Sequence, residues 1–256
     1  MLFSRYIALG DSVSIDLYPA LDAGEVDVAV ALERLPSVGH VAPLGAASLF
    51  YRNSEEHWPD DIGDDLVSLH PGVEFQNLAS DGATIGDVFG DQVPQLDGSD
   101  DPVLLTLTIG GNDLLSAYGH RPRRTLLEKI EHDIAEAYDL LVDALRGLFP
   151  NGTLIATTIY DPSDRTGRIP GVYDDAGSLP LHILDRLNDH IRAVAVGTPR
   201  VLLADVYLHF LGHGVTVPEE ERWYWRRSLI EPNATGASEI RHVWLNALRL
   251  AFPSAA

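Results

Sequence analysis

The chain has 256 residues, of which 45% are hydrophobic, and this is enough to bury a substantial core. Its 18 basic and 38 acidic residues give a formal net charge of −20, which opposes general binding to nucleic acid or anionic membrane surfaces by simple repulsion. Because the chain contains no cysteine, disulfides, thiolate metal sites and cysteine nucleophiles are excluded.

The sequence has no targeting or membrane-spanning pattern. No window approaches about 18 consecutive apolar residues, and the first five residues lack a basic region followed by a long apolar stretch. We therefore expect a cytoplasmic protein without stable membrane insertion, folded as one domain over residues 1–256. The sequence indicates no particular oligomeric state.

Five short β-like runs, flanked by turn residues, alternate with longer segments along the chain. They are Arg5–Leu9, Val73–Asn77, Val103–Ile109, Thr153–Ile159 and Val201–Ala204. This alternation predicts a parallel sheet of about five strands with helical crossovers, in a three-layer α/β/α sandwich. Ligands of such sheets bind at the carboxyl ends of the strands.

Three amphipathic helices are predicted between and after these strands. Apolar residues at spacings of three and four predict a helix after Pro122, which ends before Pro150 and Gly152. A second helix is expected over Leu181–Val196. A third is expected after Asn233, whose side chain can cap free backbone N–H groups.

Two long segments between the predicted elements have mixed composition. The segment Ala20–Asp61 combines apolar stretches with Gly, Pro and acidic residues, and we expect it to contribute to a substrate wall. The segment Asp161–Leu179 is rich in Asp, Gly, Ser and Pro, so it is either a functional lid or a plain surface loop.

Residues 6–14, with the sequence YIALGDSVS, place Ser12 where a buried strand ends. A helix that starts there supplies N–H donors and a positive potential at the edge where ligands bind. A Gly-Asp-Ser tripeptide also makes an ordinary turn or helix cap, so this run alone does not decide the function.

Two further runs follow the next two predicted strands, and together the three resemble the motif blocks of the SGNH/GDSL hydrolase family. The blocks are residues 10–13 (GDSV), residues 77–84 (NLASDGAT) and residues 109–113 (IGGND). Their order and strand context are far more specific than any one block. The resemblance implies a flavodoxin-like fold and an esterase or lipase that needs no cofactor and takes a small-molecule acyl ester as substrate.

The resemblance also implies roles for three residues. Ser12 is the expected nucleophile, and its backbone N–H, the Gly82 N–H and the Asn112 side-chain amide form the expected oxyanion hole. Fixed donors of this kind stabilise the negative charge that acyl transfer places on the carbonyl oxygen. The structural alternatives are that Gly82 ends a turn and that Asn112 caps the following helix.

The general base departs from the family pattern. The fourth family block carries Asp-x-x-His shortly before Pro-Asn, whereas here Ser228 stands at the aspartate position and Glu231 at the histidine position. A carboxylate with an ordinary pKa of about 4.3 is a poorer proton acceptor than imidazole near about 6.5, unless burial raises its pKa.

A histidine from another part of the chain is the second candidate for the base. His213 follows the last predicted strand between two glycines and could be oriented by Glu231, because triads are recognised by geometry rather than chain position. The alternative for His213 is a surface-loop histidine. His209 could reach the same region, whereas His242 is expected to point elsewhere on the C-terminal helix.

Several functions remain open at the level of sequence. The substrate is a carboxylic ester, an acylated sugar, a lysophospholipid or a thioester. One alternative is a catalytically weakened or inactive ligand-binding protein of the same fold, and a nucleotide-binding protein is disfavoured because no glycine-rich phosphate loop follows a strand. Four aspartates near the strand ends suggest a metal site as a further possibility: Asp11, Asp81, Asp87 and Asp113. Capping of helix N-termini explains these aspartates more simply.

Overall fold

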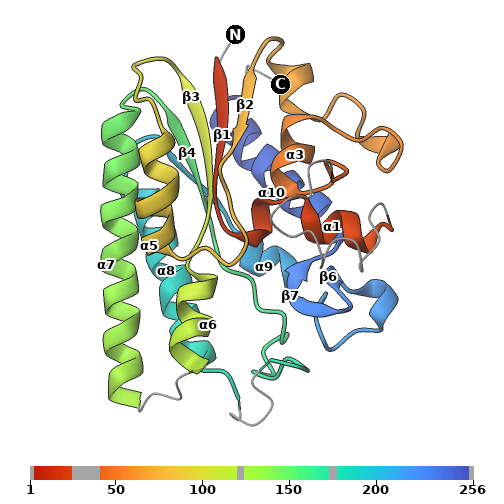
Figure 1. Cartoon of the computed structure of the whole chain (residues 1–256), viewed down its shortest axis with the longest axis vertical. Coiled ribbons are helices and arrows are strands. Elements are labelled where there is room, and N and C mark those ends of the chain that lie inside the picture. The colour runs from red at the N-terminus through yellow and green to blue at the C-terminus, as the bar shows by residue number, and fades with distance from the viewer. Residues whose placement is uncertain (1–2, 25–40, 120–123, 173–177, 254–256) are drawn as a thin grey trace.

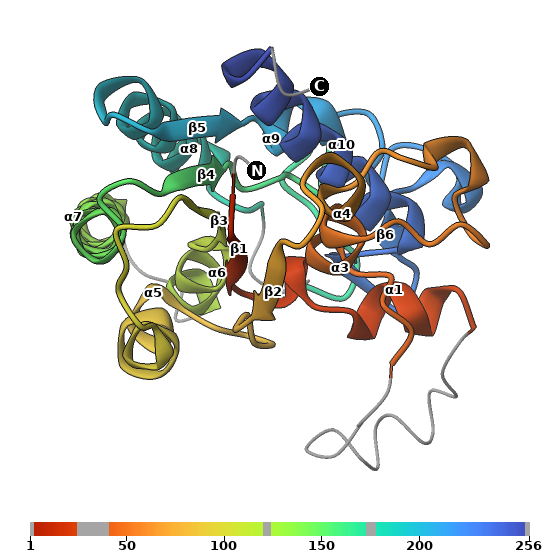
Figure 2. The same cartoon turned by 90° about the horizontal axis from the view of Figure 1, so that it is seen from above.

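A computed structural model of the chain describes residues 3–24, 41–119, 124–172 and 178–253. Its centre is a parallel sheet with the strand order β2-β1-β3-β4-β5. The strands are β1 (Arg5–Gly10), β2 (Glu74–Asn77), β3 (Val103–Thr108), β4 (Thr153–Thr157) and β5 (Val201–Ala204). All five predicted strands are therefore confirmed, and Figures 1 and 2 show helices on both faces of the sheet, as a three-layer sandwich requires.

Alternating side chains of the strands supply two separate hydrophobic cores. In β1, Ile7 and Leu9 face one core, whereas Tyr6 and Ala8 face the other. This alternation follows from the two-residue period of a strand, and both faces are apolar because both are covered. The strands of the middle of the sheet therefore read as nearly continuous hydrophobic runs.

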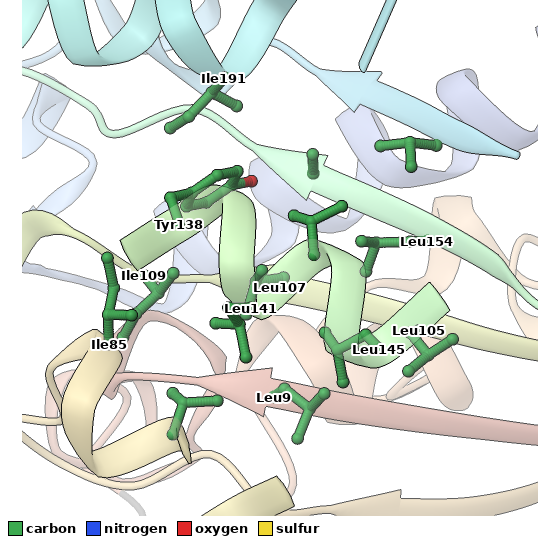
Figure 3. Packing of buried hydrophobic residues seen from close by; sticks show 14 of the residues in the cluster. Leu9, Ile85, Leu105, Leu107, Ile109, Tyr138, Leu141, Leu145, Leu154 and Ile191 are labelled. Atoms are coloured by element: carbon green, nitrogen blue, oxygen red, sulfur yellow. The ribbon is translucent and has the colours of Figure 1, made fainter. Parts of the chain in front are cut away.

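One face of the sheet is covered by α5 (Ile85–Asp87), α6 (Gly111–Gly119), α7 (Arg124–Leu148) and α8 (Leu181–Gly197). Figure 3 shows side chains of α7, among them Tyr138, Leu141 and Leu145, packed over Leu105 and Leu107 of β3. The predicted helices after Pro122 and over Leu181–Val196 are confirmed, although Pro122 itself lies outside the described residues.

The opposite face is covered by α3 (Ala46–Tyr51), α4 (Leu66–Leu69), α9 (Val206–Phe210) and α10 (Ala234–Ala251). The start of α10 is confirmed as predicted, because the Asn233 side chain accepts a hydrogen bond of 2.8 Å from the Gly236 N–H. Trp244 of α10 is fully buried and donates to Thr157 at 3.0 Å, which ties this helix to the end of β4.

A small antiparallel hairpin lies beyond the sheet and was not predicted. It consists of β6 (Tyr224–Trp225) and β7 (Ser228–Pro232), and it packs against α1 (Leu17–Asp22), as Figure 1 shows. The side chains of Tyr18 and Trp225 meet there with ring centroids 5.5 Å apart. The remaining short turns are η1 (Ser12–Ser14), η2 (Pro59–Asp61), the π-helical turn η3 (Val88–Gln92), η4 (Val93–Gln95) and η6 (Glu219–Glu221).

The fourth strand ends two residues earlier than predicted, at Thr157. The Asn188 side chain of α8 forms hydrogen bonds with both backbone groups of Ile159. It accepts from the Ile159 N–H at 2.7 Å and donates to the Ile159 carbonyl at 2.8 Å. A side-chain amide thus replaces the neighbouring strand, and the chain turns away from the sheet after Thr158.

The carboxyl end of β1 depends on a glycine at position 10. Gly10 has φ +126°, and a methyl group there would lie 1.9 Å from the Thr108 carbonyl oxygen of β3. Both the backbone conformation and the close approach exclude a side chain at this position. The strand can therefore reach its last hydrogen bonds with β3 only because residue 10 is glycine.

Replacement of Gly10 by alanine should lower the free energy of unfolding by more than about 3 kcal/mol, through backbone strain and steric overlap together. Urea denaturation followed by circular dichroism measures this loss. The matched control is Gly147→Ala in α7, where an added methyl group meets no atom within 4 Å and should change stability by about +0.5 to +1 kcal/mol. Equal behaviour of the two variants would contradict the assignment.

Candidate active site

Ser12 lies at the carboxyl end of β1, in the turn η1. The Asp11 N–H donates to the Thr108 carbonyl at 2.9 Å, and the Asp11 side chain accepts from the Val13 N–H at 3.2 Å. These two bonds fix the backbone on either side of Ser12. Ser12 is buried, at 6% exposure, and lines a cavity at the carboxyl end of the sheet.

Gln92 holds the backbone just before Ser12. Its side-chain amide accepts from the Gly10 N–H at 2.9 Å and donates to the Gly10 carbonyl at 2.7 Å. The same amide donates to the Ser80 hydroxyl at 3.3 Å. These hydrogen bonds join the first and second motif blocks. Gln92 itself is almost fully buried in the π-helical turn η3. Sequence reasoning missed this residue, because a single glutamine carries no motif.

Asn112 joins the third block to the second and also lines the cavity. Its side-chain nitrogen donates to the Ala83 carbonyl at 3.0 Å, which uses one of the two N–H groups of the amide. The neighbouring Asp113 accepts from the Ile85 N–H at 3.2 Å. The three blocks are therefore adjacent in space, as their positions after neighbouring strands predicted.

Gly82 lies in the exposed turn after β2. Its φ of +70° belongs to the left-handed region, where glycine is favoured, and an added methyl group there would meet no atom within 4 Å. Gly82 is not among the described residues that line the cavity beside Ser12. Its part in an oxyanion hole stays a prediction.

Glu231 reaches the cavity from the hairpin strand β7. Tyr160, which follows β4, donates its hydroxyl to the carbonyl of the neighbouring Ile230 at 2.7 Å and so fixes the strand next to Glu231. Glu231 is buried, at 7% exposure, and the nearby Ser12 hydroxyl lowers the pKa of its carboxyl group. Its Oε2 atom has no hydrogen-bond partner among the described residues.

The electrostatics of the cavity favour the neutral form of Glu231. Burial is the largest cause that raises the pKa of Glu231 from its ordinary 4.5. The Ser12 hydroxyl lowers it in part, the negative charges of Asp81 and Asp11 raise it, and the net pKa is about 8. Burial likewise raises the pKa of Asp11 to about 7. Both carboxyl groups therefore titrate near neutral pH.

The candidate histidines lie elsewhere. The ring of His213 stacks on Trp223 with centroids 3.5 Å apart, and His213 is not among the described residues that line the cavity. His209 pairs with Glu239 at 2.7 Å, and His242 pairs with Asp61 at 3.0 Å. Ser228, three residues before Glu231, does not line the cavity either.

The four aspartates near the strand ends accept hydrogen bonds from the protein. Besides Asp11 and Asp113, Asp87 accepts from the Thr84 N–H at 2.8 Å, and Asp81 accepts from the Tyr18 hydroxyl at 3.0 Å. The bonds of Asp11 and Asp87 cap short turns, and those of Asp81 and Asp113 join segments that are distant in the sequence. In the described part of the chain, no group of three or more His, Asp or Glu residues is arranged to hold a metal ion.

The two long segments contribute unequally to the cavity. The described residues of Ala20–Asp61 do not line it, and residues 25–40 lie outside the described structure. In contrast, the segment Asp161–Leu179 supplies Asp161, Pro162, Ile169 and Leu179 to the cavity wall. Residues 173–177 of this segment are outside the described residues.

Comparison with known families agrees with the ordered motif blocks. Residues 8–238 match the GDSL-like Lipase/Acylhydrolase family, which covers most of the chain. The chain belongs to the GDSL-like lipase/acylhydrolase family. Family membership identifies the protein as an esterase- or lipase-type hydrolase that acts on ester bonds in general. No curated protein matches the sequence significantly.

Solved structures show how widely the fold of this GDSL-family hydrolase is shared. It is similar to an extracellular lipase from Streptomyces rimosus, with 22% identity, coverage of 97% of this chain and 99% of the other, and a TM-score of 0.53. A phospholipase A1 from Streptomyces albidoflavus has 19% identity, coverage of 97% and 99%, and a TM-score of 0.56. An acetyl xylan esterase from Geobacillus stearothermophilus has 15% identity, coverage of 97% of each chain and a TM-score of 0.60.

No described helix of this GDSL-family hydrolase combines the length and the apolar character needed to cross a membrane.

The raised pKa of Glu231 makes a prediction about stability. A carboxyl group whose pKa is higher in the folded state stabilises the fold fully below pH 4.5, and this contribution is lost as pH rises through about 8. Glu231→Gln keeps a neutral side chain at every pH. The variant should therefore gain stability relative to the wild type between pH 5 and pH 9, by about 4 kcal/mol.

Chemical denaturation of both proteins at several pH values measures this difference. Asp11 is present in both proteins, and its repulsion of ionised Glu231 is part of the measured difference. A stability difference that does not change with pH would mean that Glu231 is ionised in the folded protein throughout this range.

Proposed function

We propose that the protein hydrolyses esters through an acyl intermediate on Ser12, with Glu231 as the general base. The observation that carries this proposal is that Ser12 and the buried carboxyl group of Glu231 line the same cavity, where the Ser12 hydroxyl lowers the pKa of Glu231. A nucleophile and a base within hydrogen-bond reach are the minimum requirement for this chemistry.

In the first half of the reaction, the Ser12 oxygen attacks the carbonyl carbon of the ester while ionised Glu231 accepts the hydroxyl proton. The same proton then passes to the leaving alcohol as the bond between the carbonyl carbon and the alcohol oxygen breaks. In the second half, Glu231 accepts a proton from water, whose oxygen attacks the acyl carbon and releases Ser12 with that proton. No cofactor takes part in these steps.

The raised pKa of Glu231 supports its role as a base. With a pKa of about 8 it holds a proton about as tightly as an imidazole does, or more tightly, so an ordinary carboxylate's weakness as a proton acceptor does not apply. About a tenth of the molecules would have Glu231 ionised at pH 7. We therefore assign the base to Glu231 rather than to His213, whose ring stacks on Trp223 outside the cavity lining.

The oxyanion hole is proposed to consist of the Ser12 N–H, the Gly82 N–H and the second N–H of the Asn112 amide. The Ser12 and Gly82 N–H groups donate no hydrogen bond to a backbone carbonyl within the described structure. Removing one such donor should raise the barrier by about 3 kcal/mol.

Hydrolysis of short p-nitrophenyl esters tests the two catalytic roles. Ser12→Ala should lower kcat at least about a thousandfold, because the nucleophile is lost. Glu231→Gln should lower kcat by about a hundredfold to ten-thousandfold, the range that general bases contribute. His213→Ala is the matched control and should keep the wild-type rate. A collapse in His213→Ala with normal activity in Glu231→Gln would transfer the base to the histidine.

The pH dependence separates a carboxylate base from an imidazole base. Because only ionised Glu231 accepts a proton, kcat/KM of the wild type should rise with pH and level off above about pH 8. In Glu231→His, which installs the family's usual residue, the midpoint should move down towards about 6.5. A wild-type profile that is already flat between pH 6 and pH 9 would contradict the assignment of Glu231.

A further inference from the structure

We propose that the cavity beside Ser12 binds the acyl part of the substrate as an aliphatic chain longer than acetyl. This inference rests on the proposed function, because it needs the acyl group to be attached at Ser12. It excludes acetyl esters as the preferred substrates and places the alcohol part outside the cavity.

The wall of the cavity away from Ser12 is aliphatic. Helix α6 supplies Leu114 and Leu115, and α8 supplies Leu181 and Leu184. Ile169 and Leu179 supply part of the wall from the segment between β4 and α8. An apolar wall of this kind favours an apolar occupant, because each buried methylene group leaves water.

Leu184 shows that part of this wall is not simply core packing. Its side chain is only 6% exposed, yet it belongs to neither of the two hydrophobic cores that cover the faces of the sheet. Ile183, the preceding residue, and Leu187, about one turn further along α8, do belong to the core under α7. Leu184 therefore faces the cavity, where an apolar chain would complete its packing.

The polar side chains in this part of the cavity already have partners within the protein. Thr158 donates to Asp205 at 3.1 Å, and Asp161 accepts from the Ser163 and Arg165 N–H groups, each at 2.9 Å. The Tyr118 hydroxyl donates to the Ser178 carbonyl at 2.8 Å. A sugar or a polar headgroup would have few groups left to bind, and its desolvation would be poorly compensated.

The acyl part fits the enclosed side better than the alcohol part does. The acyl chain stays attached to Ser12 until water releases it, whereas the alcohol must leave after the first step. Asp81 and Gly82, in the turn after β2, are exposed to solvent and do not line the cavity. The alcohol can leave towards this exposed turn while the chain stays between α6 and α8.

Esters of one alcohol with acyl groups of different length test this inference. We expect kcat/KM of p-nitrophenyl esters to rise from acetyl through butanoyl to hexanoyl, by about fourfold for each fully buried methylene group. A total gain of at least tenfold from acetyl to hexanoyl supports the acyl site. A smaller gain, or a preference for acetyl, overturns it.

A filled cavity should change this preference. Leu184→Trp places a larger side chain between α8 and α6, so the ratio of kcat/KM for hexanoyl to that for acetyl should fall at least tenfold. The matched control is Val196→Trp on the same helix, where the side chain is 87% exposed and the ratio should not change. An unchanged ratio in Leu184→Trp would contradict the site, since general damage to the fold lowers both rates together.

A binding measurement separates failure of the acyl site from failure of the catalytic proposal. Isothermal titration calorimetry on the Ser12→Ala protein does not depend on turnover. Octanamide should bind to this protein at least tenfold more tightly than acetamide. If it does and the wild type hydrolyses no ester, the acyl site stands and the proposed function fails. If the wild type hydrolyses acetyl esters through Ser12 but the two amides bind equally, the proposed function stands and the acyl site fails.

Discussion

The approach of β1 to β3 at Gly10 determines how the candidate site is built. The backbone of Gly10 lies so close to the Thr108 carbonyl that no side chain fits, and the Gln92 amide holds both backbone groups of Gly10 from the other side. The turn that carries Ser12 starts directly after this point. Because Gln92 also contacts Ser80 and Asn112 contacts Ala83, the first three motif blocks form one hydrogen-bonded unit at the carboxyl edge of the sheet. Such mutual support holds short loops in one geometry without a long helix or a metal ion.

Burial gives Glu231 properties that its residue type alone does not have. A carboxyl group in water is ionised at neutral pH and accepts protons weakly, but in this cavity desolvation and the nearby carboxyl groups of Asp81 and Asp11 favour the neutral form. The departure from the family's histidine is therefore compatible with proton transfer near neutral pH. The hairpin β6/β7 makes this possible, since it brings Glu231 to Ser12 and is itself fixed by Tyr160 and by its packing on α1.

The cavity has a polar end and an apolar end, and the difference follows from which elements reach it. The strand ends and the hairpin contribute Ser12, Asn112 and Glu231, whereas α6, α8 and the segment before α8 contribute mainly aliphatic side chains. The same helices also cover one face of the sheet. Leu184, which belongs to neither core, therefore lines the cavity, while Ile183 and Leu187 of the same helix pack in the core.

The sequence by itself determined the sheet, the main helices and the order of the three motif blocks. Periodicity is a local property, so the apolar runs of the five strands and the amphipathic pattern of α7, α8 and α10 could be read without any tertiary contact. Only the tertiary structure decided which distant residues meet. The turn with Ser12 and the hairpin with Glu231 are separated by more than two hundred residues, and no local pattern shows that Glu231, rather than His213, lines the cavity. Gln92 and Leu184 likewise acquire their positions from packing, because a buried amide or a leucine has no sequence signature until its neighbours are known.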